Sequence, residues 1–88
     1  MAFQYDSTKA ALNLKKHRVS FADAEGVFYD PLAIYLPDSD AEDEERFVAL
    51  GLGSAGDVLV VVYTLRDDDV RLISARRATR TEIRDYES

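Results

Sequence analysis

The chain of 88 residues contains no cysteine, and it has only one histidine, two prolines and four glycines. The absence of cysteine excludes disulfides, thiolate zinc sites and cysteine nucleophiles, and it fits a reducing compartment. His17 stands without further ligands at metal-binding spacing, so we expect neither a metal ion nor another cofactor. No apolar run approaches the length of a membrane span, and the N-terminus lacks a signal-peptide pattern. We therefore expect one soluble, cytoplasmic domain over residues 1–88 that does not contact a membrane.

The net charge of −6 argues at first against nucleic acid, which needs a basic surface. The negative charge is concentrated, however, in residues 38–45 (DSDAEDEE), which hold six acidic residues and no basic ones. The rest of the chain is neutral, with basic residues gathered in residues 9–18 and 66–84. We interpret the acidic segment as a solvated loop, with docking of a basic partner as the alternative. RNA binding at the basic residues stays open.

The hydrophobic pattern predicts an α+β domain. A strand at residues 3–5 precedes a helix that Asp6 or Ser7 caps and that runs to about His17. A second helix follows Ser20 and ends at Asp30-Pro31. Residues 33–36, 46–52, 58–65 and 70–76 are predicted strands, and Thr79 with Glu82 forms the capping box of a last helix. Hairpins between these strands imply a small antiparallel sheet of four to five strands, with two N-terminal helices and one C-terminal helix on one face.

Alternation in the last strand divides its side chains between two faces. The pattern predicts one face with Val70, Leu72, Ser74 and Arg76, and an opposite face with Arg71, Ile73, Ala75 and Arg77.

The basic residues near the C-terminus suggest phosphate chemistry. Six arginines lie there: Arg66, Arg71, Arg76, Arg77, Arg80 and Arg84. Cleavage of RNA by its 2′-hydroxyl needs a base, a cation for the phosphorane and an acid for the 5′-oxygen. The arginine fork suits the phosphate oxygens. Glu82 or His17 could serve as the base, and Tyr63 or Lys16 as the acid.

Each of these residues also has a structural interpretation. His17 suits the C-terminal end of a helix, Tyr63 suits a core, and Glu82 suits a capping box. Arginine-rich strands also occur at protein interfaces. The alternative function is therefore a non-catalytic arginine-rich module that binds a partner protein or nucleic acid, and a purely structural subunit is a third possibility.

Four stretches of the chain resemble a known family. They are Tyr5-Asp6 with Lys9; Asn13-x-x-Lys16-His17-x-Val19-Ser20-Phe21 with Ala24, Val27-Phe28 and Asp30-Pro31; Glu45-Arg46-Phe47 with Gly51; and Val61-Val62-Tyr63-Thr64-x-Arg66 followed by Ile73-Ser74-Ala75-Arg76-x-Ala78 and Glu82. In this order, over nearly the whole chain, they resemble the BrnT toxins of bacterial and archaeal type II toxin–antitoxin systems.

The resemblance implies a fold similar to the RelE/ParE toxins and a ribonuclease activity that inhibits translation. It also implies neutralisation by a BrnA-like ribbon-helix-helix antitoxin, through which the toxin would reach DNA only indirectly. Carried over by position, the catalytic candidates are Lys16, His17, Tyr63, Arg66, Arg76 and Glu82, and the RNA-binding candidates are Tyr5, Lys9, Thr64, Arg77 and Arg80.

Our hypothesis from the resemblance is that Arg66 and Arg76 hold the scissile phosphate, with Lys16 or His17 nearby. Two positions depart from the family pattern: Tyr5 replaces a tryptophan, and Arg18 replaces a glycine after the Lys-His pair. Tyr5 keeps an aromatic face. Arg18 would have to adopt a left-handed helix cap, which costs more for arginine than for glycine.

Overall fold

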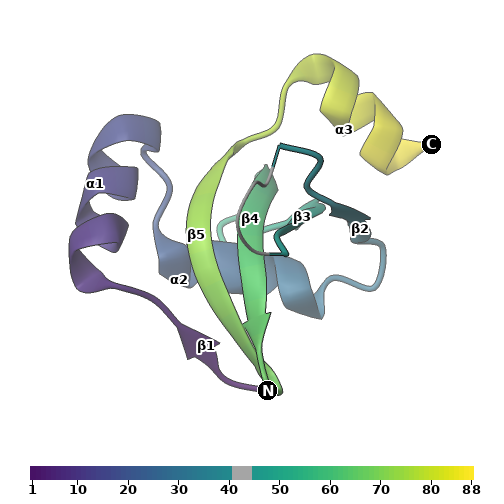
Figure 1. Cartoon of the computed structure of the whole chain (residues 1–88). Helices are drawn as coiled ribbons and strands as arrows, with labels where there is room; N and C mark the ends of the chain where they lie inside the picture. The colour runs from purple at the N-terminus through teal and green to yellow at the C-terminus, as the bar shows by residue number, and fades with distance from the viewer. Residues whose placement is uncertain (41–44) are drawn as a thin grey trace.

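The computed structural model describes residues 1–40 and 45–88, so part of the acidic segment lies outside the described residues. The elements in chain order are β1 (Phe3–Gln4), α1 (Ser7–His17), α2 (Phe21–Glu25), the 3₁₀ helix η1 (Gly26–Tyr29), β2 (Ile34–Pro37), β3 (Phe47–Leu52), β4 (Val58–Arg66), β5 (Asp69–Arg77) and α3 (Arg80–Glu87). The strands form one sheet in the order β1-β5-β4-β3-β2 (Figure 1). The predicted α+β class, with two N-terminal helices and one C-terminal helix, is confirmed.

Strand β1 departs from the predicted antiparallel sheet. Strands β2 to β5 pair antiparallel, but β1 joins β5 in parallel. The carboxylate of Asp69 accepts hydrogen bonds from the Ala2 N–H at 3.1 Å and the Gln4 side-chain amide at 2.9 Å. The Val70 N–H donates to the Ala2 carbonyl at 2.9 Å. These contacts hold the N-terminus along the start of β5, a long-range pairing that local sequence patterns cannot reveal.

The sequence led us to expect all helices on one face of the sheet, and the structure differs from this expectation. Helices α2 and η1 pack against the sheet, and α2 lies behind it in the view of Figure 1. Helix α1 lies beside β5, on the side away from β4, and α3 contacts β3. The predicted second helix is also divided into α2 and η1. Ser20 caps α2 as predicted, because its hydroxyl accepts from the Asp23 N–H at 3.0 Å. The division falls at Gly26, where an added Cβ would lie 2.5 Å from the Ser54 backbone nitrogen, so the turn between β3 and β4 packs directly against this residue.

A β-bulge in β5 reverses the predicted faces of its second half. Tyr63 pairs with Leu72, but the preceding residue, Val62, pairs with Ser74. Ile73 is therefore the extra residue, and a bulge of this kind shifts the alternation by one position. As a result Ala75 is fully buried in the core, whereas the prediction placed it opposite the core residues.

The bulge leaves Ser74 and Arg76 on the face of the sheet opposite the core, which we call the outer face. Ser74 pairs with Val62 and Arg76 with Val60, both on that face.

Asn13 fastens α1 to the unpaired side of β5. Its side chain is 6% exposed, and its amide donates to the Val19 carbonyl at 3.0 Å and the Ala75 carbonyl at 2.8 Å. Its oxygen accepts from the Ala75 N–H at 3.0 Å. Strand β4 pairs with β5 at Ala75 on one side, and β1 pairs with β5 only at Val70 and Arg71. Asn13 therefore provides the hydrogen-bond partners of Ala75 on the side away from β4.

Replacing Asn13 with alanine is expected to lower the free energy of unfolding by about 3 kcal/mol, since buried backbone groups of Val19 and Ala75 lose their partners. Denaturant titration of the purified protein measures the change. The control is Lys15→Ala on the exposed side of α1, which we expect to stay within about 0.5 kcal/mol of wild type. Equal stability of the two variants would contradict the anchoring role of Asn13.

Arg18 adopts the left-handed cap that the sequence comparison implied. Its φ is 60° and its ψ is 28°, and its N–H donates to the Leu14 carbonyl at 2.9 Å. Because a Cβ is strained in this region, Arg18→Gly is expected to raise the free energy of unfolding by about 1 kcal/mol. The same titration tests this, and an unchanged or lower stability would show that the arginine side chain compensates for the strain.

Candidate active site

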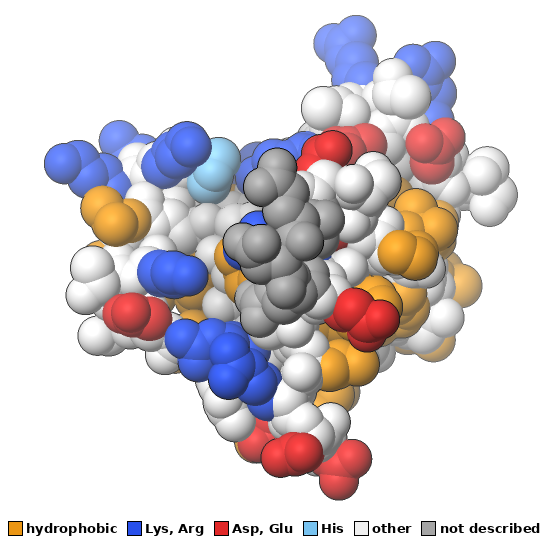
Figure 2. Space-filling view, in the orientation of Figure 1, with side chains coloured by type: hydrophobic (Ala, Val, Ile, Leu, Met, Phe, Trp, Pro, Cys, Tyr) orange, Lys and Arg blue, Asp and Glu red, His pale blue; other side chains and the backbone are white. Residues whose placement is uncertain are grey.

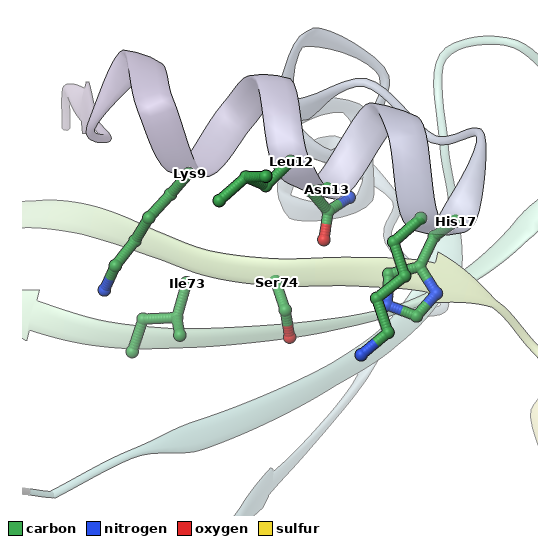
Figure 3. Close-up of a pocket in the computed structure, with 7 residues that line it drawn as sticks. Lys9, Leu12, Asn13, His17, Ile73 and Ser74 are labelled. Carbon is green, nitrogen blue, oxygen red and sulfur yellow. The ribbon is translucent and has the colours of Figure 1, made fainter.

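A groove of about 260 Å³ runs between α1 and β5. Figure 3 shows the residues that line it, which are Lys9, Leu12, Asn13, Lys16, His17, Ile73 and Ser74. Helix α1 and strand β5 run in the same direction here. Lys9 therefore lies toward Ile73, and His17 lies beyond Ser74 toward the end of β5 (Figure 3). This end of β5 carries Arg76.

Helical spacing and the bulge together place these side chains in the groove. Lys9, Asn13 and Lys16 are separated by four and three residues, so they share one face of α1. On the strand, the bulge turns Ser74 to the outer face. Arg76 lies two residues further along that face, which separates its Cα from that of Ser74 by about 7 Å.

The groove is basic. Lys9, Lys16 and His17 line it, and among residues 1–40 and 45–88 no aspartate or glutamate does. Figure 2 shows Lys and Arg side chains on both sides of the pale blue side chain, which is His17 because the chain has one histidine. Such a surface suits an anionic ligand, and phosphate oxygens are the matching group.

Arg76 and Glu82 form a two-pronged ion pair between β5 and α3. Arg76 Nη1 donates to Glu82 Oε1 at 2.8 Å, and Nη2 donates to Oε2 at 2.9 Å. The hydrogen bonds from Arg76 lower the pKa of Glu82 to about 2 despite partial burial, and a further bond comes from the Thr79 N–H. Glu82 also completes the predicted capping box with Thr79. A carboxylate with so low a pKa is a poor general base near neutral pH.

The Arg76 guanidinium still has capacity for a ligand. A third bond goes from Nη1 to the Arg77 carbonyl at 3.2 Å, so three of its five N–H groups are engaged within the described residues. The side chain is 42% exposed, so the guanidinium is not closed off from solvent.

The lowered pKa of Glu82 predicts loss of stability in acid. A depressed folded-state pKa stabilises the protein above the unfolded value, and this contribution is lost as pH falls through the folded value. For Glu82 the window runs from 4.5 down to about 2. Thermal unfolding across this range should show a steeper decline for wild type than for Glu82→Gln. Parallel curves would show that the ion pair does not stabilise the fold.

Tyr63 and Thr64 do not reach the groove. Tyr63 is 6% exposed and packs between Phe28 and Phe47, and burial raises the pKa of its hydroxyl. The core interpretation of Tyr63 is therefore confirmed, and it cannot donate a proton to RNA bound at the groove. Thr64 is also buried, with its hydroxyl donating to the Glu45 carbonyl at 2.8 Å.

Arg66 and Arg76 lie at opposite ends of the sheet, so the predicted shared phosphate is wrong. Arg66 pairs with Asp69, whereas Arg76 pairs with Val60 near the start of β4. At about 3.3 Å per residue, the six steps from Val60 to Arg66 separate the two backbones by about 20 Å. The two side chains are too far apart to hold one phosphate together.

Three of the RNA-binding candidates also lie away from the groove. Tyr5 packs edge-on against Phe21, on the side of α1 that faces α2. Arg77 forms an exposed ion pair with Asp57 at 3.3 Å, and Arg80 lies on α3. Of the five RNA-binding candidates, only Lys9 lines the groove.

Two polar residues of the groove, Asn13 and Ser74, were not among the candidates. Asn13 was noted only as part of the family pattern, although a polar residue on the inward side of a helix between leucines is a usable signal. Ser74 was placed on the same face as Val70 and Leu72, because no sequence feature marks the bulge at Ile73.

Among residues 1–40 and 45–88, no group of three or more potential metal ligands is brought together. Within the same residues, no helix has the length and apolar character needed to span a membrane.

Comparisons with known proteins agree with the fold. The family described as "Ribonuclease toxin, BrnT, of type II toxin-antitoxin system" matches residues 5–82. The crystal structure of the ribonuclease toxin BrnT from Brucella abortus superimposes with a TM-score of 0.70 at 24% identity, covering 91% of this chain and 99% of that one. No curated protein matches the sequence. On the family match, the chain belongs to the BrnT ribonuclease toxins of type II toxin–antitoxin systems.

Proposed function

We propose that the chain is an endoribonuclease toxin that cleaves RNA in the groove between α1 and β5 and thereby inhibits translation. Membership of a ribonuclease family supports the reaction class, and the type II system implies an antitoxin that neutralises it. One observation supports the location: the groove gathers Lys9, Lys16 and His17, and no carboxylate of the described part of the chain lines it.

The proposed chemistry uses the RNA's own 2′-hydroxyl. His17 takes the proton from the 2′-hydroxyl, because a ring nitrogen of imidazole can accept a proton. The freed 2′-oxygen attacks the neighbouring phosphorus, and the bond from phosphorus to the 5′-oxygen breaks. Arg76 and Lys16 stabilise the negative charge on the five-coordinate phosphorus, and the Lys16 ammonium protonates the leaving 5′-oxygen. The products are a 2′,3′-cyclic phosphate and a 5′-hydroxyl, and no metal ion takes part in the scheme.

Two further arginines of the sheet, Arg66 and Arg71, have a supporting role in this proposal. Arg66 and Arg71 lie toward the other end of the outer face, since Arg71 pairs with Thr64 and Arg66 follows two residues later on the same face. They would contact the RNA backbone away from the bond that is cut, and their removal would weaken binding more than chemistry.

Expression of single variants in growing cells tests the proposal. Lys16 lines the groove, whereas Lys15 is its exposed neighbour on α1 and lies outside the lining. Wild type and Lys15→Glu are expected to arrest growth and fragment total RNA, and Lys16→Glu to do neither. Immunoblotting confirms that all three proteins accumulate. If wild type is harmless and leaves RNA intact, the alternative of a non-catalytic binding module replaces the toxin.

A further inference from the structure

Strand β2 is an exposed edge of the sheet. Among the described residues only β3 pairs with it, on one side. The Asp38 N–H donates to the Arg46 carbonyl at 2.8 Å, and this bond shows which residues of β2 hydrogen-bond to β3. With alternating pairs, the backbone N–H and carbonyl of Tyr35 point away from β3. The backbone of Pro37 has the same orientation as that of Tyr35, so its lack of an N–H removes no hydrogen bond to β3.

Apolar side chains accompany this free edge. Leu32, Tyr35 and Leu36 are 68%, 47% and 58% exposed. Figure 2 shows hydrophobic side chains gathered over β2 and the segment that leads into it. An exposed edge with adjoining apolar side chains is the kind of surface to which another protein adds a strand.

The charge next to this edge limits which partner fits it. The acidic stretch 38–45, with six carboxylates and no basic residue, begins directly after β2. A second copy of the chain at the same edge would bring two such stretches together, and RNA would meet the same repulsion. A basic protein segment would be attracted.

We propose that the β2 edge, defined as Leu32 with Ile34–Pro37, is the docking surface for the antitoxin. The antitoxin contributes a short extended segment that pairs with the backbone of Tyr35, covers Leu32 and Leu36 with apolar side chains, and carries basic residues toward the acidic stretch. This inference rests on the proposed toxin function for the existence of the antitoxin. The β2 edge is separate from the groove, since β4 and β3 lie between it and β5.

Binding of the purified antitoxin, encoded beside the gene for this chain, tests the docking surface. Leu36→Lys places a positive charge on the β2 edge, and Leu65→Lys makes the same change at the end of β4. The two leucines are similarly exposed, at 58% and 53%. Calorimetry should show affinity lowered about tenfold or more by Leu36→Lys, as for a central interface residue. We expect Leu65→Lys to stay within about twofold of wild type.

RNA cleavage by each protein alone is measured in parallel, and all three are expected to cleave equally. If the wild-type protein does not cleave RNA, the proposed function is refuted. The measured affinities would still show whether the antitoxin binds at the β2 edge. Equal affinity of Leu36→Lys and wild type would overturn the docking surface, and so would a wild type that does not bind the antitoxin. A wild-type dimer that Leu36→Lys dissociates would assign the edge to a second copy instead. Raising the salt concentration should weaken the wild-type complex, because opposite charges approach each other there.

Discussion

His17→Gln is expected to lower RNA cleavage by between about 10² and 10⁴, the usual contribution of a general base. His17 lies at the end of α1, half-buried in the groove, and glutamine keeps a polar side chain of similar length without a group that takes up a proton. Single-turnover cleavage of an RNA oligonucleotide by the purified proteins measures the loss. Binding of an RNA analogue with 2′-deoxy sugars should change little.

Thermal unfolding provides the control for His17→Gln. If the variant unfolds at the wild-type temperature and binds the deoxy analogue normally, the loss of cleavage belongs to the chemical step. Cleavage at the wild-type rate by a folded variant would remove His17 from the mechanism and leave the groove as a binding surface only.

Arg76→Ala is expected to lower cleavage by about 10² to 10³, the loss found when a group that stabilises transition-state charge is removed. The neighbouring residue supplies a matched control. Arg77 is exposed and pairs with Asp57, so Arg77→Ala removes the same side chain from the same strand without touching the groove. We expect Arg77→Ala to cleave at close to the wild-type rate.

Glu82→Gln separates the two roles of the Arg76–Glu82 pair. Glutamine can still accept the hydrogen bond from the Thr79 N–H, so the capping box is preserved while the negative charge is lost. Cleavage is expected to persist in this variant, because the carboxylate is held by Arg76 and its pKa is about 2. A folded Glu82→Gln protein that fails to cleave would identify Glu82, and not His17, as the base.

Local sequence signals predicted most of the elements. The cap at Ser20, the capping box of Thr79 and the short β-branched run of β4 depend on neighbouring residues, and such features are readable along the chain. Hairpins likewise predicted the antiparallel order of β2 to β5. The left-handed conformation of Arg18 followed from the family pattern and is confirmed.

The candidate site was harder to predict because its geometry depends on contacts between distant residues. The bulge at Ile73 decides which side chains of β5 share a face, and it has no marker in the sequence. The family resemblance suggested that Arg66 and Arg76 act together, although the register of β4 and β5 places them at opposite ends of the sheet. Asn13 binds residue 75, which is 62 positions away, so its anchoring role is visible only in the fold.

The most direct test of the proposed mechanism is the identity of the RNA ends after cleavage by the purified chain in the presence of a metal chelator. Mass spectrometry of the fragments distinguishes the possible products. Attack by the 2′-hydroxyl predicts 2′,3′-cyclic phosphate and 5′-hydroxyl ends, with no cleavage where the sugar at the cut position is 2′-deoxy. Fragments with 5′-phosphate ends, or RNA that the chelator protects, would contradict the mechanism.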